Sequence, residues 1–259
     1  MPNEFPLPNT STDLTGQVAL VTGATGGLGY RFAGVLADAG AAVLLAGRRL
    51  DRLQQVAHEI CSRGQRCAPV PMDLAQPAGL ASALDGAEAA FGTVTILVNN
   101  AVIPDAQRAH RISLDLIDKV IDTNLRGPFV LTCEVARRLI AAGRQGRIIN
   151  LSSMAAYHYA GDGAALYSTT KAAVNRMTEA LAVEWVRYGI NVNAIAPGAF
   201  MSEMVQEHIE RVGDFTAGLP RRRIGDPAQL DSTLLFLAAP ASEFVTGTIV
   251  KVDDGQYPR

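Results

Sequence analysis

Short, almost continuously apolar runs alternate with longer helical patterns along most of the chain, and this alternation limits the possible folds more than any other feature. Runs that are apolar on both faces are typical of a parallel sheet covered by helices on each side. The sequence therefore predicts an α/β fold with a doubly wound parallel sheet of about seven strands. The predicted strands cover residues 17–23, 41–47, 67–73, 94–100, 146–152, 190–196 and 246–252.

The even spacing of these elements indicates one domain. Predicted strands and helices follow one another over residues 16–259 without a linker-like or low-complexity break. Residues 1–15, rich in Pro, Asn and Thr, form an N-terminal tail in this interpretation. The longest weakly patterned segment, 199–225, is expected to be a lid, a binding loop or a disordered stretch, since long connections usually have one of these roles.

Charge and cysteine content limit the kind of partner. The 259 residues include 23 basic and 25 acidic side chains, a balance that offers no broad field to nucleic acid or to an anionic membrane. No apolar run approaches the ~18 residues of a membrane span, and the N-terminus lacks the pattern of a signal peptide. The three cysteines have no metal-ligand spacing and suit a reducing compartment. We expect a cytoplasmic protein without a metal, acting on a small molecule.

A glycine-rich turn, TGATGGLG at 22–29, joins the first predicted strand to a helix. Glycine permits positive φ and close approach of a ligand to the backbone, and the helix N-terminus offers free N–H groups to an anion. Gly23, Gly27 and Gly29 set a spacing that differs from G-x-G-x-x-G. Both a tight strand-to-helix turn and a pyrophosphate site fit this pattern. Its position at the first crossover of a doubly wound sheet favours the nucleotide.

The end of the second predicted strand carries Arg48 and Arg49 where an acidic residue would accept hydrogen bonds from the adenosine ribose. A guanidinium can form a fork to a 2'-phosphate and stack on adenine. The pair therefore favours NADP(H), with NAD(H) less expected. The alternative is that both arginines are ordinary solvated loop residues.

Tyr167 and Lys171 are four positions apart at the opening of a predicted amphipathic helix, so they share one face. A free phenol has a pKa near ~10, and a nearby ammonium favours phenolate and makes proton exchange with an alcohol or ketone feasible. Most such pairs are a tyrosine packed under a surface lysine. Here Ser152 and Ser153 end a strand shortly before the pair, at the sheet edge where ligands bind.

The ordered motifs of the chain resemble the short-chain dehydrogenase/reductase family, in its short single-domain branch with the 3-oxoacyl-carrier-protein reductases. The resemblance covers nearly the whole chain from Leu14 onward and implies a Rossmann-type, three-layer αβα fold. It depends on TGATGGLG (22–29), Asp73-Leu74, NNAV (99–102), the asparagine of DTNLRG (122–127), LSS before YSTTK, NAIAPG (193–198) and the terminal TGTIVKVDDG.

The resemblance also implies roles for individual residues. Tyr167 would be the general acid/base, and Ser153 would bind the substrate carbonyl. Lys171 would lower the pKa of the tyrosine and bind the nicotinamide ribose, and Asn124 would hold a water that passes protons to bulk solvent. Together with the two arginines, the expected cofactor contacts are Gly23, Thr25, Gly27, Leu28, Gly29, Arg48, Arg49, Asp73, Leu74, Asn100, Ala101, Tyr167, Lys171, Pro197, Gly198 and Ser202.

Three positions depart from the family pattern. Thirteen residues separate Ser153 from Tyr167, one more than is common in the family, which keeps Ser152 as an alternative to Ser153. Val102 replaces a glycine, and because a β-branched residue resists positive φ we expect an extended backbone there. The terminal VDDGQ replaces VDGG in a region that builds subunit contacts in relatives, where a homotetramer, or else a dimer, is expected.

The residues around the predicted catalytic group are mostly apolar or aromatic, which suits a hydrophobic ketone or a 3-oxoacyl chain. Alternatively, Tyr157 and Tyr159 pack at a subunit interface. The expected activity is NADP-dependent hydride transfer between nicotinamide and a ketone or secondary alcohol. A catalytically weak NADP-binding sensor or scaffold, or an NAD-dependent sugar or alcohol dehydrogenase, are the alternatives. The proposed pocket residues are Val102, Ile103, Met154, Tyr157, His158, Tyr159, Phe200, Met201 and Met204.

Overall fold

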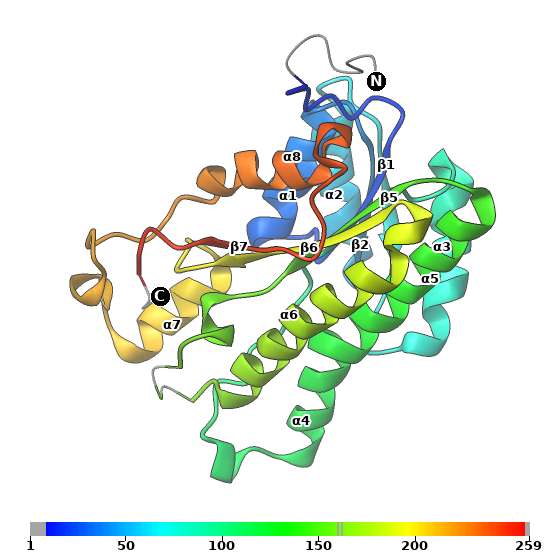
Figure 1. The fold of residues 1–259 in the computed structure, drawn as a ribbon. Helices are drawn as coiled ribbons and strands as arrows, with labels where there is room; N and C mark the ends of the chain where they lie inside the picture. The colour runs from blue at the N-terminus through cyan, green and yellow to red at the C-terminus, as the bar shows by residue number, and fades with distance from the viewer. Residues whose placement is uncertain (1–8, 160, 162, 257–259) are drawn as a thin grey trace.

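A computed structural model describes residues 9–159, 161 and 163–256, and in it seven parallel strands form one sheet in the order β3-β2-β1-β4-β5-β6-β7. This confirms the predicted Rossmann-type α/β fold (Figure 1). Each strand overlaps its predicted run, although β3 ends before Asp73 and β7 begins after Thr246. The strands are β1 (Val18–Thr22), β2 (Ala42–Gly47), β3 (Cys67–Pro71), β4 (Ile96–Asn99), β5 (Gly146–Leu151), β6 (Ile190–Pro197) and β7 (Ile249–Val252).

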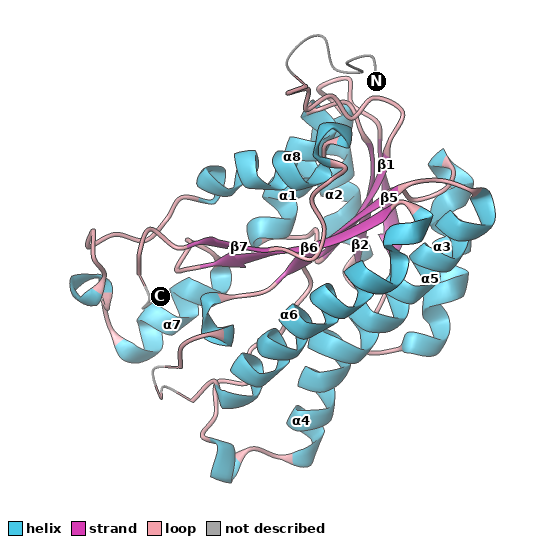
Figure 2. Ribbon diagram, in the orientation of Figure 1, coloured by secondary structure: helices cyan, strands magenta, loops and turns pink. Residues whose placement is uncertain are grey.

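Helices cover both faces of the sheet, as the continuously apolar strands require. One layer contains α1, α2 and α8, and the other contains α3, α5 and α6 (Figure 2). Among the described residues, no helix is both long and apolar enough to cross a membrane. The helices are α1 (Gly27–Asp38), α2 (Leu50–Cys61), α3 (Leu80–Phe91), α4 (Leu114–Ile121), α5 (Gly127–Ala142), α6 (Ala165–Trp185), α7 (Glu203–Val212) and α8 (Asp231–Ala238).

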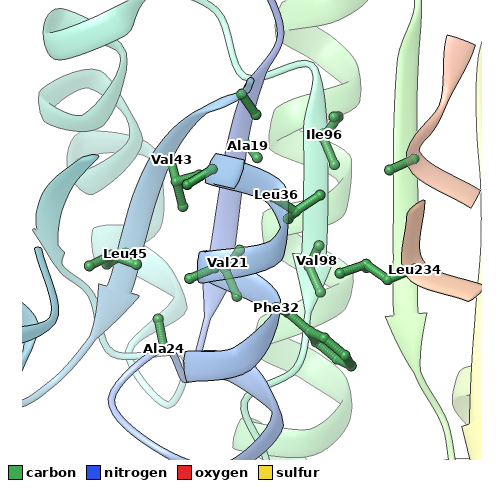
Figure 3. Close-up of a cluster of buried hydrophobic side chains, with 14 of the residues drawn as sticks. Ala19, Val21, Ala24, Phe32, Leu36, Val43, Leu45, Ile96, Val98 and Leu234 are labelled. Atoms are coloured by element: carbon green, nitrogen blue, oxygen red, sulfur yellow. The ribbon is translucent and has the colours of Figure 1, made fainter. Parts of the chain in front are cut away.

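Alternate residues of the central strands are buried in two separate hydrophobic cores. Val21 and Val98 face the first layer, where Phe32 of α1 and Leu234 of α8 cover them (Figure 3). The adjacent residues of the same strands face the α3, α5 and α6 layer instead. Burying a large apolar side chain contributes roughly 1.5–3 kcal/mol, so packing from both sides holds the strand ends firmly in place.

The strand order reverses beside β1, because β2 pairs with one edge of β1 and β4 pairs with the other. The connections that leave β1 and β4 therefore diverge to opposite sides and open a crevice at the carboxyl ends of these strands. Ligands of doubly wound sheets bind in such crevices.

The segment 199–225 contains a helix, α7, which corrects the expectation of an unpatterned loop. Met204, Val205, His208 and Ile209 are half-buried along one side of α7, and Ser202 caps its start by accepting a hydrogen bond from the N–H of Val205. The hydrophobic stripe is short and includes a histidine, so the sequence of this segment gives only a weak helical period. Residues 1–15 are predicted from the sequence to form an N-terminal tail, but Leu14 is fully buried in the first core.

Candidate active site

The glycine-rich turn lies in the crevice between β1 and β4. Gly23 has a φ of +67°, which only glycine adopts without strain. Gly29 is required for a different reason: a β-carbon at this position would lie 2.3 Å from the carbonyl oxygen of Gly23 and 2.4 Å from Nδ2 of Asn100. The first turn of α1 is therefore packed directly against the backbone of the preceding strand end.

The start of α1 has the properties of an anion site. Gly26 is the N-cap, no side chain caps the helix within the described chain, and its first turn contains no acidic residue. The first N–H groups of a helix have no partners inside the helix and carry a partial positive charge. Gly27, with a φ of +52°, adds no side chain of its own to the turn. These residues fit the pyrophosphate of a dinucleotide.

Arg49 joins the rim of the same turn by donating a hydrogen bond from Nη2 to Oγ1 of Thr25 at 2.8 Å. Arg48 and Arg49 are both exposed after β2, where a guanidinium could reach a 2'-phosphate. Asp73 follows β3 with one carboxylate oxygen accepting from the N–H of Ala75 at 3.0 Å. Its other oxygen can accept from an adenine amino group, as the predicted contact requires.

The ends of β1 and β4 are tied together by Thr22 and Asn100. The Thr22 hydroxyl accepts from the N–H groups of Asn100 and Ala101, at 3.0 and 3.1 Å. In return, the Asn100 side chain donates to the carbonyls of Thr22 and Gly23. Val102, the next residue but one, does not adopt a positive φ, which supports the expected accommodation of a β-branched residue in this loop.

Tyr167 and Lys171 lie in the first two turns of α6, as predicted. Lys171 is buried, its Nζ donates to the carbonyl of Leu151 at 2.5 Å, and the same Nζ is 5.6 Å from the centre of the Tyr167 ring. Burial lowers the pKa of the Lys171 ammonium to about 8, so it is still mainly protonated at neutral pH. The pair thus places a buried cation beside a half-buried phenol.

The two serines after β5 have different surroundings. Ser152 is buried, and its hydroxyl donates to the carbonyl of Lys171 at 3.4 Å. Ser153 is half-buried and accepts from the N–H of Ala155 at 3.1 Å, which leaves its hydroxyl proton available. This geometry favours Ser153 as the group that would donate to a substrate oxygen.

Asn124 is the centre of a π-helical turn, Asp122–Arg126, between α4 and α5. Its amide forms two hydrogen bonds of 2.9 Å with the N–H and carbonyl of Ile103. A cavity of about 10 Å³ lies between Asn124, Lys171 and Asn99 and has room for about one water. The Oδ1 of Asn99 is buried without a partner in the described structure. The surroundings of Asn124 therefore suit the predicted water.

The end of β6 and the segment after it contain three of the predicted cofactor contacts, Pro197, Gly198 and Ser202. The N–H of Gly198 donates to the carbonyl of Val252, and the Ser202 hydroxyl accepts from the N–H of Val205 as the cap of α7. A β-carbon at Gly198 would lie 2.4 Å from Oε1 of Gln256, so this glycine is needed for packing. Pro197 is the last residue of β6, at the carboxyl end of the strand.

The expected apolar pocket is only partly assembled. Met154 is fully buried and Phe200 belongs to the first core, so neither presents a free face. The ammonium of Lys251 lies 4.0 Å from the centre of the Tyr157 ring, and the Tyr159 hydroxyl accepts from the N–H of Gly163. Both rings are half-exposed, and each already has a polar partner in the fold. This weakens the argument that they line a pocket for a hydrophobic substrate.

Three contributions were missed in the sequence. Thr22 joins the two strand ends, Asp105 is buried and accepts from the N–H of Leu166 at the start of α6, and Glu203 lies against Gly26. Thr22 could have been noticed as the first residue of the glycine motif. Asp105 and Glu203 act across 61 and 177 positions, where no local pattern marks them.

A fold of this kind binds dinucleotides where its strand order reverses, and a tyrosine beside a buried lysine at the same edge suits proton exchange with a hydroxyl. The class so defined is that of nicotinamide-dependent oxidoreductases. The chain belongs to the short chain dehydrogenase family, whose model matches residues 17–213. This confirms the family resemblance of the sequence and makes the protein an oxidoreductase.

Similar proteins cover almost the whole chain. The oxidoreductase UcpA of Escherichia coli is 36% identical over 93% of this chain and 95% of its own length. The 2-dehydro-3-deoxy-D-gluconate 5-dehydrogenase of Dickeya dadantii is 35% identical over 95% and 98%. The solved structure of a gluconate 5-dehydrogenase from Burkholderia cenocepacia, in complex with NADP and tartrate, has a TM-score of 0.89 at 33% identity and covers 96% of this chain and 98% of that one.

Proposed function

We propose that this protein is an NADP-dependent dehydrogenase or reductase in which Tyr167 exchanges a proton with a secondary alcohol or ketone. One observation carries the proposal. The buried Nζ of Lys171 lies 5.6 Å from the Tyr167 ring, at the strand edge that also presents the glycine-rich turn. The NADP-bound structures among the relatives, together with Arg48 and Arg49, support the choice of cofactor.

The residues divide the reaction between them. A bound nicotinamide would supply or accept the hydride. Ser153 donates to the substrate oxygen and orients it, while the Tyr167 hydroxyl gives its proton to that oxygen during reduction or takes it during oxidation. The Lys171 ammonium stabilises the phenolate left by the first of these transfers. The water-sized cavity beside Asn124 and Lys171 offers a route for returning the proton to solvent.

The substrate we favour is a hydroxylated carboxylic acid or the matching keto acid. Three relatives are named for gluconate or a deoxygluconate derivative, and one structure contains tartrate. At the rim, the Arg211 guanidinium approaches the carbonyl of Ala106, beside the loop that holds the start of α6. A cation at this place suits a carboxylate better than an acyl chain. The 3-oxoacyl thioester predicted from the sequence is the second candidate, because CoA-linked substrates are named for other relatives.

The test is a screen of purified protein for NADPH and NADH oxidation with keto acids, simple ketones and 3-oxoacyl thioesters. Tyr167→Phe removes the proton donor and is expected to lower kcat by about 10²–10⁴-fold while NADPH binding is kept. Tyr188→Phe is the matched control, because this half-exposed tyrosine bonds only to Arg187 in the interactions we describe. A Tyr167→Phe variant with full activity would refute the mechanism.

We also propose that the protein is a homo-oligomer, a tetramer or a dimer. Several large apolar side chains are exposed on its helices and near its carboxyl end, among them Phe129 on α5, Val183 on α6 and Phe244 before β7. Exposed apolar side chains in such number favour association. Light scattering coupled to size-exclusion chromatography gives the mass directly, and a monomer at micromolar concentration would contradict this proposal.

A further inference from the structure

The first residues of α7 lie over the glycine-rich turn. A β-carbon at Gly26 would be 3.0 Å from Oε1 of Glu203, 3.5 Å from its carboxyl carbon and 3.7 Å from Oε2. A β-carbon at Gly27 would be 3.8 Å from Cβ of Ser202. The carboxylate of Glu203 therefore lies beside the backbone of Gly26, in the turn at which the pyrophosphate of a dinucleotide would bind.

The chemistry of this position explains why a carboxylate suits it. The free N–H groups and partial positive charge at the start of α1 favour any anion placed there. No acidic residue in the first turn of α1 occupies the position from within the helix. Glu203 is the first residue of α7 and itself favours the positive end of that helix, so its carboxylate lies near two helix N-termini.

A pyrophosphate and a carboxylate cannot share this position. At contact distance two anions repel each other, so the phosphates and the carboxylate compete for the same space. We propose that Glu203 is an internal occupant of the phosphate site, which NADP(H) must displace, so that cofactor binding moves the start of α7 away from the turn. The inference depends on the proposed cofactor and adds a residue that sets its affinity.

The decisive comparison is the Kd of NADPH for the wild type and for Glu203→Gln, followed by nicotinamide fluorescence at fixed ionic strength. Glutamine keeps the shape of the side chain and removes its charge, so the variant is expected to bind NADPH about tenfold more tightly. Glu207→Gln, one turn further along α7 and exposed like Glu203, makes the same change in net charge at a position that no contact places beside the glycine-rich turn in the part of the chain we describe. This control is expected to stay within about twofold of the wild type because its charge lies further from the phosphates and solvent screens it over that distance.

Two fragments of the cofactor show which part of NADPH the Glu203 carboxylate opposes. Adenosine 2'-monophosphate lacks the pyrophosphate and should bind the wild type and Glu203→Gln equally, whereas 2'-phospho-ADP-ribose, which lacks the nicotinamide, should show the same gain as NADPH. Equal NADPH affinities in the two proteins, weaker binding by Glu203→Gln, or an equal gain in Glu207→Gln would each overturn the displacement proposal alone. Absence of NADPH binding by every protein would overturn the proposed cofactor and this inference with it.

Discussion

Replacing Lys171 by methionine should show how much the burial of its ammonium costs in stability. Burial lowers the pKa of the Lys171 ammonium from 10.5 to about 8. Below pH 8 both the folded and the unfolded chain hold the proton, and the folded protein bears the full cost of a buried ammonium, about 3 kcal/mol. Between about pH 8 and 10.5 only the unfolded chain keeps the proton, so the free energy of unfolding rises with pH. Above that range the cost disappears.

Methionine has a similar length, carries no charge and therefore bears no such cost. It also leaves the Leu151 carbonyl without its donor, a loss of about 1–3 kcal/mol that does not depend on pH. At neutral pH these effects nearly cancel, and the variant is expected to be as stable as the wild type or slightly more stable. The wild type should then gain about 3 kcal/mol relative to the variant as the pH rises from 7 to 10.5.

Urea unfolding at several pH values measures this difference. Trp185, the single tryptophan of the chain, is buried at the end of α6 and reports on the helix that contains Lys171. Other titrating groups cancel in the comparison because the two proteins share them. Lys119→Met, at an exposed position of α4, should show a difference that does not change with pH. A constant difference between the wild type and Lys171→Met over the same range would refute the reasoning.

Two further substitutions test the cofactor half of the site. Gly29→Ala forces a β-carbon to within 2.3 Å of a backbone carbonyl and should cost about 1–3 kcal/mol of stability together with NADPH binding, whereas Gly34→Ala on the same helix has room and should be neutral or stabilising in thermal unfolding. Arg49→Ala should weaken NADPH binding about 10–100-fold and leave NADH unchanged in fluorescence titration. An equal loss for the two cofactors would contradict the assignment of Arg49 to the 2'-phosphate.

The parts of the fold that could be predicted were those with a local pattern. The apolar strands, the glycine turn and the placement of Tyr167 and Lys171 on one helix face follow from periods and spacings within short windows. The helix α7 could not be predicted so easily, because its apolar stripe spans barely two turns. Contacts across long sequence separations, such as Asp105 with the N–H of Leu166, depend on how the loops pack and leave no pattern in the sequence.

The two halves of the site differ in how firmly they are built. The catalytic half is fixed from several sides: Asn124 holds Ile103 with two hydrogen bonds, Asp105 caps the helix of Tyr167, and Leu151 accepts from Lys171. In the cofactor half, Thr22 and Asn100 hold the strand ends together, whereas the start of α7 beside the glycine-rich turn lies at the surface. A rigid proton-transfer group beside a movable cover suits an enzyme that binds its cofactor first, because displacing Glu203 would free α7 to adjust to the substrate.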